Sequence, residues 1–298
     1  MSQRCLSRPF ASGVAPLLLG VLSCLSFSCR AKPDEQAKDD AKTEAPEPGS
    51  ARAIQEEMGT LPPPDVVQKV TNSAGRQPYS GPTATVRGVV RIKGDSAPKT
   101  ALTGGVEPRC EMAEPMFGRL FREGPGRTLA DVLVTVTEYD GYVPVPAGKE
   151  TVMVRGEGCA WDRRTIALTF GQRIGVVAAD RRPYVPDLVG QRRVAELFAM
   201  PGADPIHLVP AAPGQYALQD SMRLYSRSDV FVLAYSTHDV TGLDGVYEIS
   251  GVPVGKVKIG AYLPATTGVA EKVVELEAGK TKEVDLEIEY KADADSTP

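Results

Sequence analysis

The body of this chain is a series of short runs in which apolar and polar residues alternate, separated by Gly and Pro. Residues 84–94 place Val86, Val90 and Ile92 on one face of an extended strand. A period of two is typical of a β-strand that is buried on one face. The same texture recurs at 129–139, 151–156, 165–170, 173–179, 216–220, 229–235, 245–250, 256–263, 271–279 and 282–290.

Helical spacing is confined to residues 191–200, where Val194, Leu197 and Phe198 form a short apolar stripe, and this stretch is equally compatible with a loop. Strands therefore do not alternate with helices, which argues against a doubly wound fold. Many short strands with turn residues between them favour sandwiches or barrels. The predicted fold class is all-β.

The first thirty residues differ from the body. Arg4 and Arg8 precede an apolar stretch of about a dozen residues at 14–25, which is too short to span a hydrocarbon core of roughly 30 Å. The pattern predicts a cleaved signal peptide over residues 1–29.

Two cysteines close this apolar stretch, Cys24 after VLS and Cys29 after SFS, and both contexts resemble the lipobox cut by lipoprotein signal peptidase. Cys24 has the better aliphatic residue three positions upstream, whereas Cys29 lies nearer the change to polar sequence. We predict that one of the two is lipidated; the alternative is an ordinary signal peptide with incidental cysteines. Acylation would hold the protein to a membrane of the bacterial cell envelope, on the outer membrane or the periplasmic face.

Residues 30–82 are rich in charged residues, Ala, Pro, Ser and Gly, and carry few apolar side chains. Such a composition predicts a disordered tether, and a short disordered tail is expected over 291–298. Signal cleavage removes two of the 34 basic residues and none of the 38 acidic ones, which leaves a net charge of −6. This acidic balance argues against nucleic acid as a partner.

Cys110 and Cys159 are the cysteines that remain in the body. In an exported protein a pair of cysteines is most simply a disulfide, and we predict one here. A metal or redox site is the weaker alternative, because neither a CxxC spacing nor a neighbouring His accompanies them.

Several landmarks follow one another in a recognisable order: the strand VRGVV (86–90), Cys110, TLADV (128–132), the Gly-Cys step at 158–159, FGQ (170–172), and a DG-Y then P-x-G signature within 240–255. This order resembles a family of bacterial exported proteins in which a cupredoxin-like domain precedes a carboxypeptidase-regulatory-like (transthyretin-like) module. The resemblance implies a cupredoxin-like Greek-key sandwich over 83–239, packed with a smaller transthyretin-like β-sandwich module over 240–290. Because about 50 residues bury little surface, we expect this module to borrow the strand at 84–93.

In copper-binding members of that family the metal is held by a His after the Gly-Gln strand and by a Cys-x-x-His segment, often followed by Met. On this chain those positions fall near Tyr184, Asp220, Arg223 and Ser226. A small slip does not restore the set, since no His lies between 160 and 206 and no Cys follows 159. The expectation is a cupredoxin-like scaffold without its metal, and no cofactor.

Two alternatives remain open: a replacement copper site, and hydrolysis by carboxylates alone, because Asp and Glu are plentiful. His207 and His238, the only histidines, could form a replacement copper site with Met200 or Met222. Motifs that pair a nucleophile with a base, bind a catalytic metal or cradle phosphates are missing from the sequence, so we expect no catalytic residues and no enzyme.

The resulting functional prediction is a membrane-anchored envelope lipoprotein that acts as a metal-free binding or structural module. Its expected partner is another envelope protein or a glycan, engaged through loops of a β-sandwich. The alternative is a copper-binding or electron-transfer cupredoxin-like protein.

Overall fold

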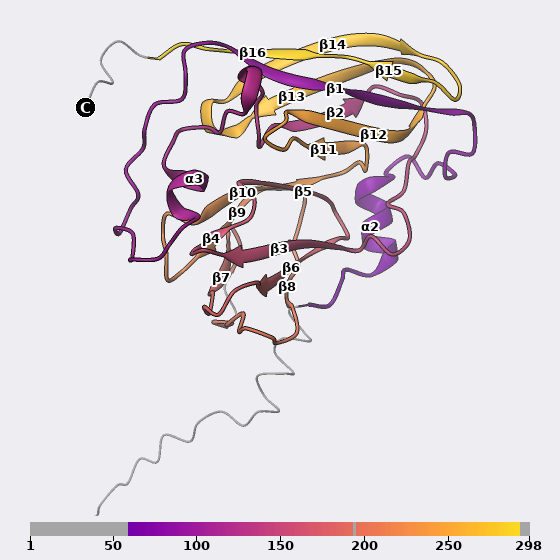
Figure 1. Cartoon of the computed structure of the whole chain (residues 1–298). Coiled ribbons are helices and arrows are strands. Elements are labelled where there is room, and N and C mark those ends of the chain that lie inside the picture. Colours follow the sequence, from indigo (N-terminus) through magenta and orange to yellow (C-terminus); the bar gives the residue numbers. More distant parts are fainter. Residues whose placement is uncertain (1–58, 193–194, 293–298) are drawn as a thin grey trace, which may run out of the picture. The chain divides into compact units, whose positions relative to one another are not determined.

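The computed structural model describes residues 59–192 and 195–292, so the predicted signal peptide, Cys24, Cys29 and most of the predicted tether and tail lie outside the described residues. Strands dominate the described part, and the predicted all-β class is confirmed (Figure 1). The strands are β1 (Thr83–Gly94), β2 (Leu133–Thr137), β3 (Thr151–Glu157), β4 (Ala160–Trp161), β5 (Thr165–Thr169), β6 (Arg173–Ala178), β7 (Pro186–Val189), β8 (Ile206–Leu208), β9 (Gly214–Asp220), β10 (Arg227–Leu233), β11 (His238–Val240), β12 (Val246–Pro253), β13 (Gly255–Leu263), β14 (Gly268–Leu276), β15 (Thr281–Glu283) and β16 (Leu286–Tyr290). The helices are α2 (Pro64–Thr71), α3 (Ala113–Phe117) and the short 3-10 turns η1 (Pro125–Arg127) and η2 (Pro264–Thr266). Among the described residues, none of these helices is long and apolar enough to cross a membrane.

The first sandwich consists of β1, β2 and β11–β16. One sheet has the order β12-β1-β15 with β16 also paired to β1, and the other has the order β11-β2-β13-β14. Their inner faces share one core, to which β1 contributes Val86, Val90 and Ile92, the three residues that the alternation assigned to one face. The sheet also joins the two ends of the body, because β1 runs parallel to both β15 and β16 (Figure 1).

The second sandwich consists of β3–β10. Its sheets have the orders β5-β10-β9-β7 and β4-β3-β6-β8, and they enclose a core that includes Trp161 and Tyr184. Each sheet contains one parallel pair, β5 with β10 and β3 with β6, while its other pairings are antiparallel. Parallel neighbours require crossover connections, so each sheet pairs two strands that are not consecutive in the chain.

The two cores divide the chain differently from the predicted boundary at 239/240. Strands β1 and β2 precede the second sandwich in sequence, yet they pack with β12 and β13 of the first. The second sandwich is therefore inserted between β2 and β11. Periodicity shows which face of β1 is buried but not which strand it pairs with, and this is why the predicted range 83–239 merged two cores. The expected borrowing of the strand at 84–93 by residues 240–290 is observed.

The predicted tether also ends earlier than residue 82. Residues 64–71 form helix α2, with Pro64 at its start, Asp65 in its first turn and Lys69 in its last. Pro is favoured at the first helical position, and these charges complement the helix dipole. Val67 and Val70 pack against the second core, which gives the helix an apolar face to bury.

In the described part of residues 191–200 there is no helix, so the loop alternative is the one observed. This loop is attached to the segment between β6 and β7, since Tyr184 and Ala199 exchange backbone hydrogen bonds of 3.1 and 2.8 Å. Leu197 and Ala199 are buried in the second core. Of the three residues of the predicted apolar stripe, Leu197 is therefore buried as part of a loop, Phe198 is 50% exposed, and Val194 lies outside the described residues.

A buried polar cluster joins the two sandwiches. Asp131, which lies just before β2, accepts two hydrogen bonds of 2.7 Å from the Nε and Nη2 atoms of Arg122. From the second sandwich, the backbone N–H of Arg164 donates to the Asp131 carboxylate, and the hydroxyl of Thr165 donates to its carbonyl. Bidentate arginine–carboxylate pairs fix orientation, so this cluster sets how β5 begins beside β2.

Candidate functional site

A disulfide joins Cys110 to Cys159, as predicted. Around it, α3 and Tyr225 form a small separate core, in which the rings of Phe117 and Tyr225 lie 6.4 Å apart. The disulfide thus holds the segment before α3 against the β3–β4 turn. Tyr225 belongs to the β9–β10 turn, so three segments distant in sequence meet at this end of the second sandwich.

The four positions that the sequence assigned to missing copper ligands are brought together at the same end. Tyr184 lies between β6 and β7, Asp220 ends β9, and Arg223 and Ser226 lie in the β9–β10 turn. The guanidinium carbon of Arg223 is 5.1 Å from the centroid of the Tyr184 ring. Asp220 and Ser226 are hydrogen-bonded through their backbones at 2.9 Å, with all four residues buried.

Asp220 and Arg223 form a buried ion pair. The Nη1 atom of Arg223 lies 3.0 Å from Oδ2 of Asp220, and the side chains are 6% and 0% exposed, respectively. Oδ1 of Asp220 accepts the backbone N–H groups of Val185 and Met222 at 3.2 and 3.1 Å. A buried carboxylate needs such partners, because desolvation of both charges opposes the Coulomb attraction between them.

Tyr184 connects this ion pair to the disulfide. Its Oη donates to Oδ2 of Asp180 at 3.2 Å and accepts the backbone N–H of Cys159 at 3.2 Å. Burial raises the pKa of Tyr184, so the phenol stays neutral. Burial also favours a higher pKa for Asp180, but hydrogen bonds from Arg182, Gly158 and Tyr184 outweigh it and lower the pKa.

The donor set at this end does not fit copper. Copper sites of the cupredoxin kind need imidazole and sulfur donors around one point, whereas Arg223 is a cation and Asp220 is already engaged by three donors. Within residues 59–192 and 195–292, no group of three or more His, Cys, Asp or Glu is arranged to hold a metal ion.

The two histidines of the alternative site lie on different sandwiches. His207 is in β8 of the second, and His238 is in β11 of the first. The Nε2 atom of His238 is hydrogen-bonded to the Thr169 hydroxyl at 3.2 Å. Burial lowers the pKa of His238 to about 4, and burial together with Arg173 lowers the pKa of His207.

A pocket of about 360 Å³ lies beside Arg223, between residues 103–107 and residues 221–225. Its lining includes the exposed apolar side chains of Val106, Met222 and Leu224. Nε of Arg223 and Oη of Tyr225 are buried and have no hydrogen-bond partner among the described residues. Sequence reasoning missed this pocket, because its two walls are far apart in the chain and meet only through the fold and the disulfide.

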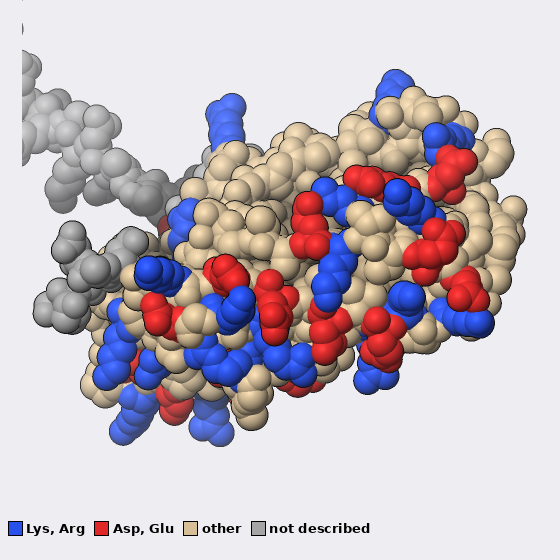
Figure 2. All heavy atoms as spheres, turned by 90° about the horizontal axis from the view of Figure 1, so that it is seen from above, with Lys and Arg blue, Asp and Glu red and all other residues tan. Residues whose placement is uncertain are grey.

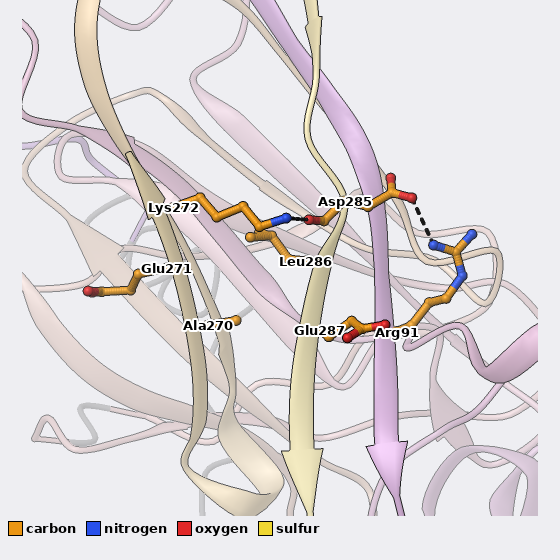
Figure 3. A pocket seen from close by; sticks show the side chains of 7 residues that line it. All are labelled: Arg91, Ala270, Glu271, Lys272, Asp285, Leu286 and Glu287. Carbon is orange, nitrogen blue, oxygen red and sulfur yellow. Dashed lines mark hydrogen bonds and ion pairs between the residues drawn. The ribbon is translucent and has the colours of Figure 1, made fainter. Parts of the chain in front are cut away.

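A second hollow, of about 480 Å³, is lined by residues of β1, β14 and β16 and by Asp285, and Figure 3 shows the side chains that line it. Its polar side chains engage one another: Nζ of Lys272 donates to the Asp285 carbonyl at 2.5 Å, and Arg91 pairs with the Asp285 carboxylate at 2.9 Å. These groups are satisfied within the protein, so the pocket at the β9–β10 turn is the stronger candidate site.

The outer face of the first sandwich carries charges of both signs. Lys93 pairs with Glu289 at 2.8 Å, and Lys258 pairs with Glu271 at 2.9 Å. Figure 2 shows Lys and Arg interspersed with Asp and Glu across the face seen from above. This face therefore provides no extended patch of a single charge sign.

No protein-family profile and no curated protein sequence matches this chain. Among solved structures, it is similar to the copper-containing nitrite reductase from Thermus scotoductus at 12% identity and a TM-score of 0.24, covering 32% of this chain and 24% of the reductase. It is similar to amicyanin from Paracoccus versutus at 18% identity and a TM-score of 0.24, covering 30% and 84% of the two chains. A reduced amicyanin mutant gives 15% identity and a TM-score of 0.25, covering 33% and 98%. The chain thus spans about a quarter of the reductase, and similarities of this size carry no argument about its function.

Proposed function

We propose that this chain is an envelope lipoprotein whose body is a metal-free binding module, and that it contacts its partner with the β9–β10 end of the second sandwich. The observation that carries the proposal is the buried Asp220–Arg223 pair at the positions where the resemblance expects copper ligands. Arg223 has no lone pair to offer a metal ion, and its ion pair with Asp220 already engages the carboxylate that could otherwise act as a ligand.

The cupredoxin-like assignment of the second sandwich belongs to the same proposal. Its support is internal: two sheets with one parallel pair each, and a β9–β10 turn that meets the segment after β6 at one end. The transthyretin-like assignment of the first sandwich is likewise proposed, on the DG-Y and P-x-G residues at the start and the end of β12.

Membrane attachment is proposed through a lipid on Cys24 or Cys29, both outside the described residues. Its support is the short apolar segment that ends in cysteine. Labelling of cells with a palmitate analogue tests it. We expect label in the wild type and loss of label when both cysteines are replaced by Ser, whereas label that survives this double replacement contradicts lipidation at these positions.

A binding role is preferred to catalysis because the polar groups of the site are an ion pair and two unpaired donors, without a nucleophile paired to a base. The expected partner is an envelope protein or a glycan. Met222 and Leu224 are exposed at this end, and methionine is enriched at recognition surfaces.

Titration of the purified protein with cuprous and cupric ions separates this proposal from the copper-binding alternative. We expect no stoichiometric, tight binding to the wild type, and no difference when His207 and His238 are both replaced by Ala. Tight one-to-one binding that disappears in the double variant establishes the alternative.

A further inference from the structure

We infer that a groove on the outer face of the first sandwich binds one pyranose ring of a neutral glycan. The groove has a volume of about 230 Å³ and lies where β2, β13 and β14 meet β10 and the residues that follow it. It shares no lining residue with the pocket at the β9–β10 turn, so the inference goes beyond the proposed function and does not depend on it. Its lining combines a glycine, a threonine, a carboxylate and three aromatic rings: Gly260, Thr135, Glu271, Phe231, Tyr235 and Tyr262.

Gly260 forms the floor of the groove. It lies inside β13 between Ile259 and Ala261, whose side chains belong to the first core, so a side chain at 260 would point away from that core. A Cβ atom built on Gly260 would meet Thr135 Oγ1 at 3.4 Å, an ordinary contact, and no other atom within 4 Å. The other strand glycines without a positive φ have an atom at 2.6 Å or less from the same place: Gly88, Gly156, Gly175 and Gly268.

The fold therefore does not require glycine at position 260. Glycine inside a strand loses more backbone freedom on folding than any other residue and offers no side chain to pack. Where a strand retains one, it often marks a place that a ligand or another backbone approaches closely. Among the described residues, no backbone atom beyond the two chain neighbours lies within 4 Å of the Cβ position of Gly260. This leaves a ligand as the group that needs the open floor.

Three aromatic side chains form the walls. The rings of Phe231 and Tyr262 lie edge to face, with centroids 5.7 Å apart and planes at 87°. An edge-to-face pair leaves the faces of one ring uncovered by its partner. Both rings, and that of Tyr235, are half-buried, so a ligand in the groove can reach them. A pyranose ring has apolar C–H groups on its faces and hydroxyls around its edge, which suits a slot with aromatic walls.

The charges at the rim select a neutral, hydroxyl-rich ligand. The Glu271 carboxylate pairs with Nζ of Lys258 at 2.9 Å, and their side chains are 56% and 31% exposed. Because the pair is neutral overall, a charged ligand gains no net attraction there. Both groups still reach solvent, and they offer acceptors and donors to sugar hydroxyls. A proline-rich peptide would also fit aromatic walls, but proline has no N–H to donate to the carboxylate.

The size of the groove limits the ligand to one ring. Pockets for drug-sized molecules have volumes of roughly 300–1,000 Å³, and this groove is smaller. The groove is open to solvent at Glu271 and at Val269, which is 65% exposed. The rest of a longer glycan would therefore extend into solvent.

NMR of ¹³C-labelled tyrosine rings in the full chain tests the inference, in a detergent without a sugar headgroup. The neutral probes are cellotetraose, maltotetraose and chitotetraose, and the contrasting probes are acidic tetragalacturonate and blocked tetraproline. We expect at least one neutral tetrasaccharide to shift the signals of Tyr235 and Tyr262 saturably in the millimolar range. Tyr247, in the first core, and Tyr225, at the β9–β10 turn, serve as internal controls that should not shift.

Gly260→Thr is the decisive variant, because it fills the floor without straining the backbone. Threonine suits a strand, so we expect stability to stay the same or rise. Affinity for the neutral tetrasaccharide should fall roughly tenfold or more, since the ring loses its place. Val273→Thr is the matched control: it lies opposite Lys258 on the same face of the sheet, outside the groove, and should leave affinity unchanged.

Substitution of Tyr262 separates stacking from hydrogen bonding. Tyr262→Phe keeps the ring and should keep most of the affinity. Tyr262→Leu keeps an apolar side chain but loses the flat face, and we expect binding to weaken roughly fivefold. Thermal unfolding of both variants shows whether the fold is retained.

Three outcomes overturn the inference: no shift at Tyr262 with any neutral tetrasaccharide, tighter binding of tetragalacturonate or tetraproline than of every neutral sugar, or unchanged affinity in Gly260→Thr. A Tyr262 signal that moves when the protein alone is diluted also overturns it, because a second copy of the chain then occupies the groove. Shifts confined to Tyr225 overturn it too, but they support the proposed function by placing the ligand at the β9–β10 end.

Discussion

The guanidinium of Arg223 lies over the ring of Tyr184, 5.1 Å from its centroid, while the same guanidinium donates to Asp220. The β9–β10 turn is therefore held in place by two contacts of Arg223, one with the Asp220 carboxylate and one with the face of the Tyr184 ring. Cation–π contacts are stronger when they are desolvated, as this one is. A turn held in this way presents Met222 and Leu224 to solvent on a backbone that is already ordered, so its backbone loses little conformational entropy on binding.

Breaking the buried ion pair should be strongly destabilising. Asp220→Asn leaves a buried cation without its counter-charge, and we expect the free energy of unfolding to fall by roughly 3–5 kcal/mol. The double variant Asp220→Asn, Arg223→Met should recover a large part of that loss. Urea denaturation followed by circular dichroism measures both.

The exposed pair Lys93–Glu289 is the matched control, with side chains 64% and 76% exposed. Lys93→Met should change stability little, because solvent and salt screen such a pair. An equal loss from Asp220→Asn and Lys93→Met would contradict the assigned importance of the buried pair.

Removal of the disulfide should loosen the pocket as well as the fold. It closes a loop between cysteines that are 49 residues apart, and loop-closure entropy predicts a loss of about 4 kcal/mol in the Cys110→Ser, Cys159→Ser double variant. Hydrogen exchange should also rise first in residues 103–107, whose attachment to the second sandwich runs through Cys110. Unchanged protection of that segment in the reduced protein would show that other contacts hold it.

Stability should fall on acidification through His238. Burial lowers its folded-state pKa to about 4 from the usual 6.5, so the unfolded chain takes up the proton first as the pH drops. The stabilisation is complete above pH 6.5 and is lost progressively as the pH falls through 4, by about 3 kcal/mol in total. His238→Gln should flatten this part of the curve of unfolding free energy against pH, and a curve of unchanged slope would show that carboxylates alone cause it.

Residues 240–298 should not fold in isolation. In the first sandwich, β12, β15 and β16 all pair with β1, and β13 pairs with β2. A fragment without those strands exposes the apolar faces that Val90 and Val134 cover. A cooperative thermal transition in the fragment alone would contradict this, and addition of a peptide spanning 83–94 serves as the complementation control.

The sequence was a good guide wherever the information is local. Alternation placed Val86, Val90 and Ile92 on the buried face of β1, and the pairing of Cys110 with Cys159 followed from export and elimination. Short strands such as β4 and β8 escaped detection, because two or three residues carry no measurable period. Residues 282–290 read as one strand but form β15 and β16, since Val284 and Asp285 leave the ladder without breaking the alternation.

Non-local features could be predicted only in part. The landmark order singled out Tyr184, Asp220 and Arg223 as the positions of one possible site, but it did not predict that Asp220 and Arg223 form an ion pair stacked on the Tyr184 ring. The strand partners of β1 and the pocket beside Tyr225 depend on contacts between segments more than 100 residues apart. Composition and periodicity contain no information about such contacts.

The metal content of the protein as isolated tests the central claim most directly. Inductively coupled plasma mass spectrometry gives the number of copper atoms per chain. The protein is purified without chelators from cells grown with added copper. The account predicts far less than one, with the same value in a variant lacking His207 and His238. One copper per chain that survives purification and falls in that variant would contradict a metal-free module.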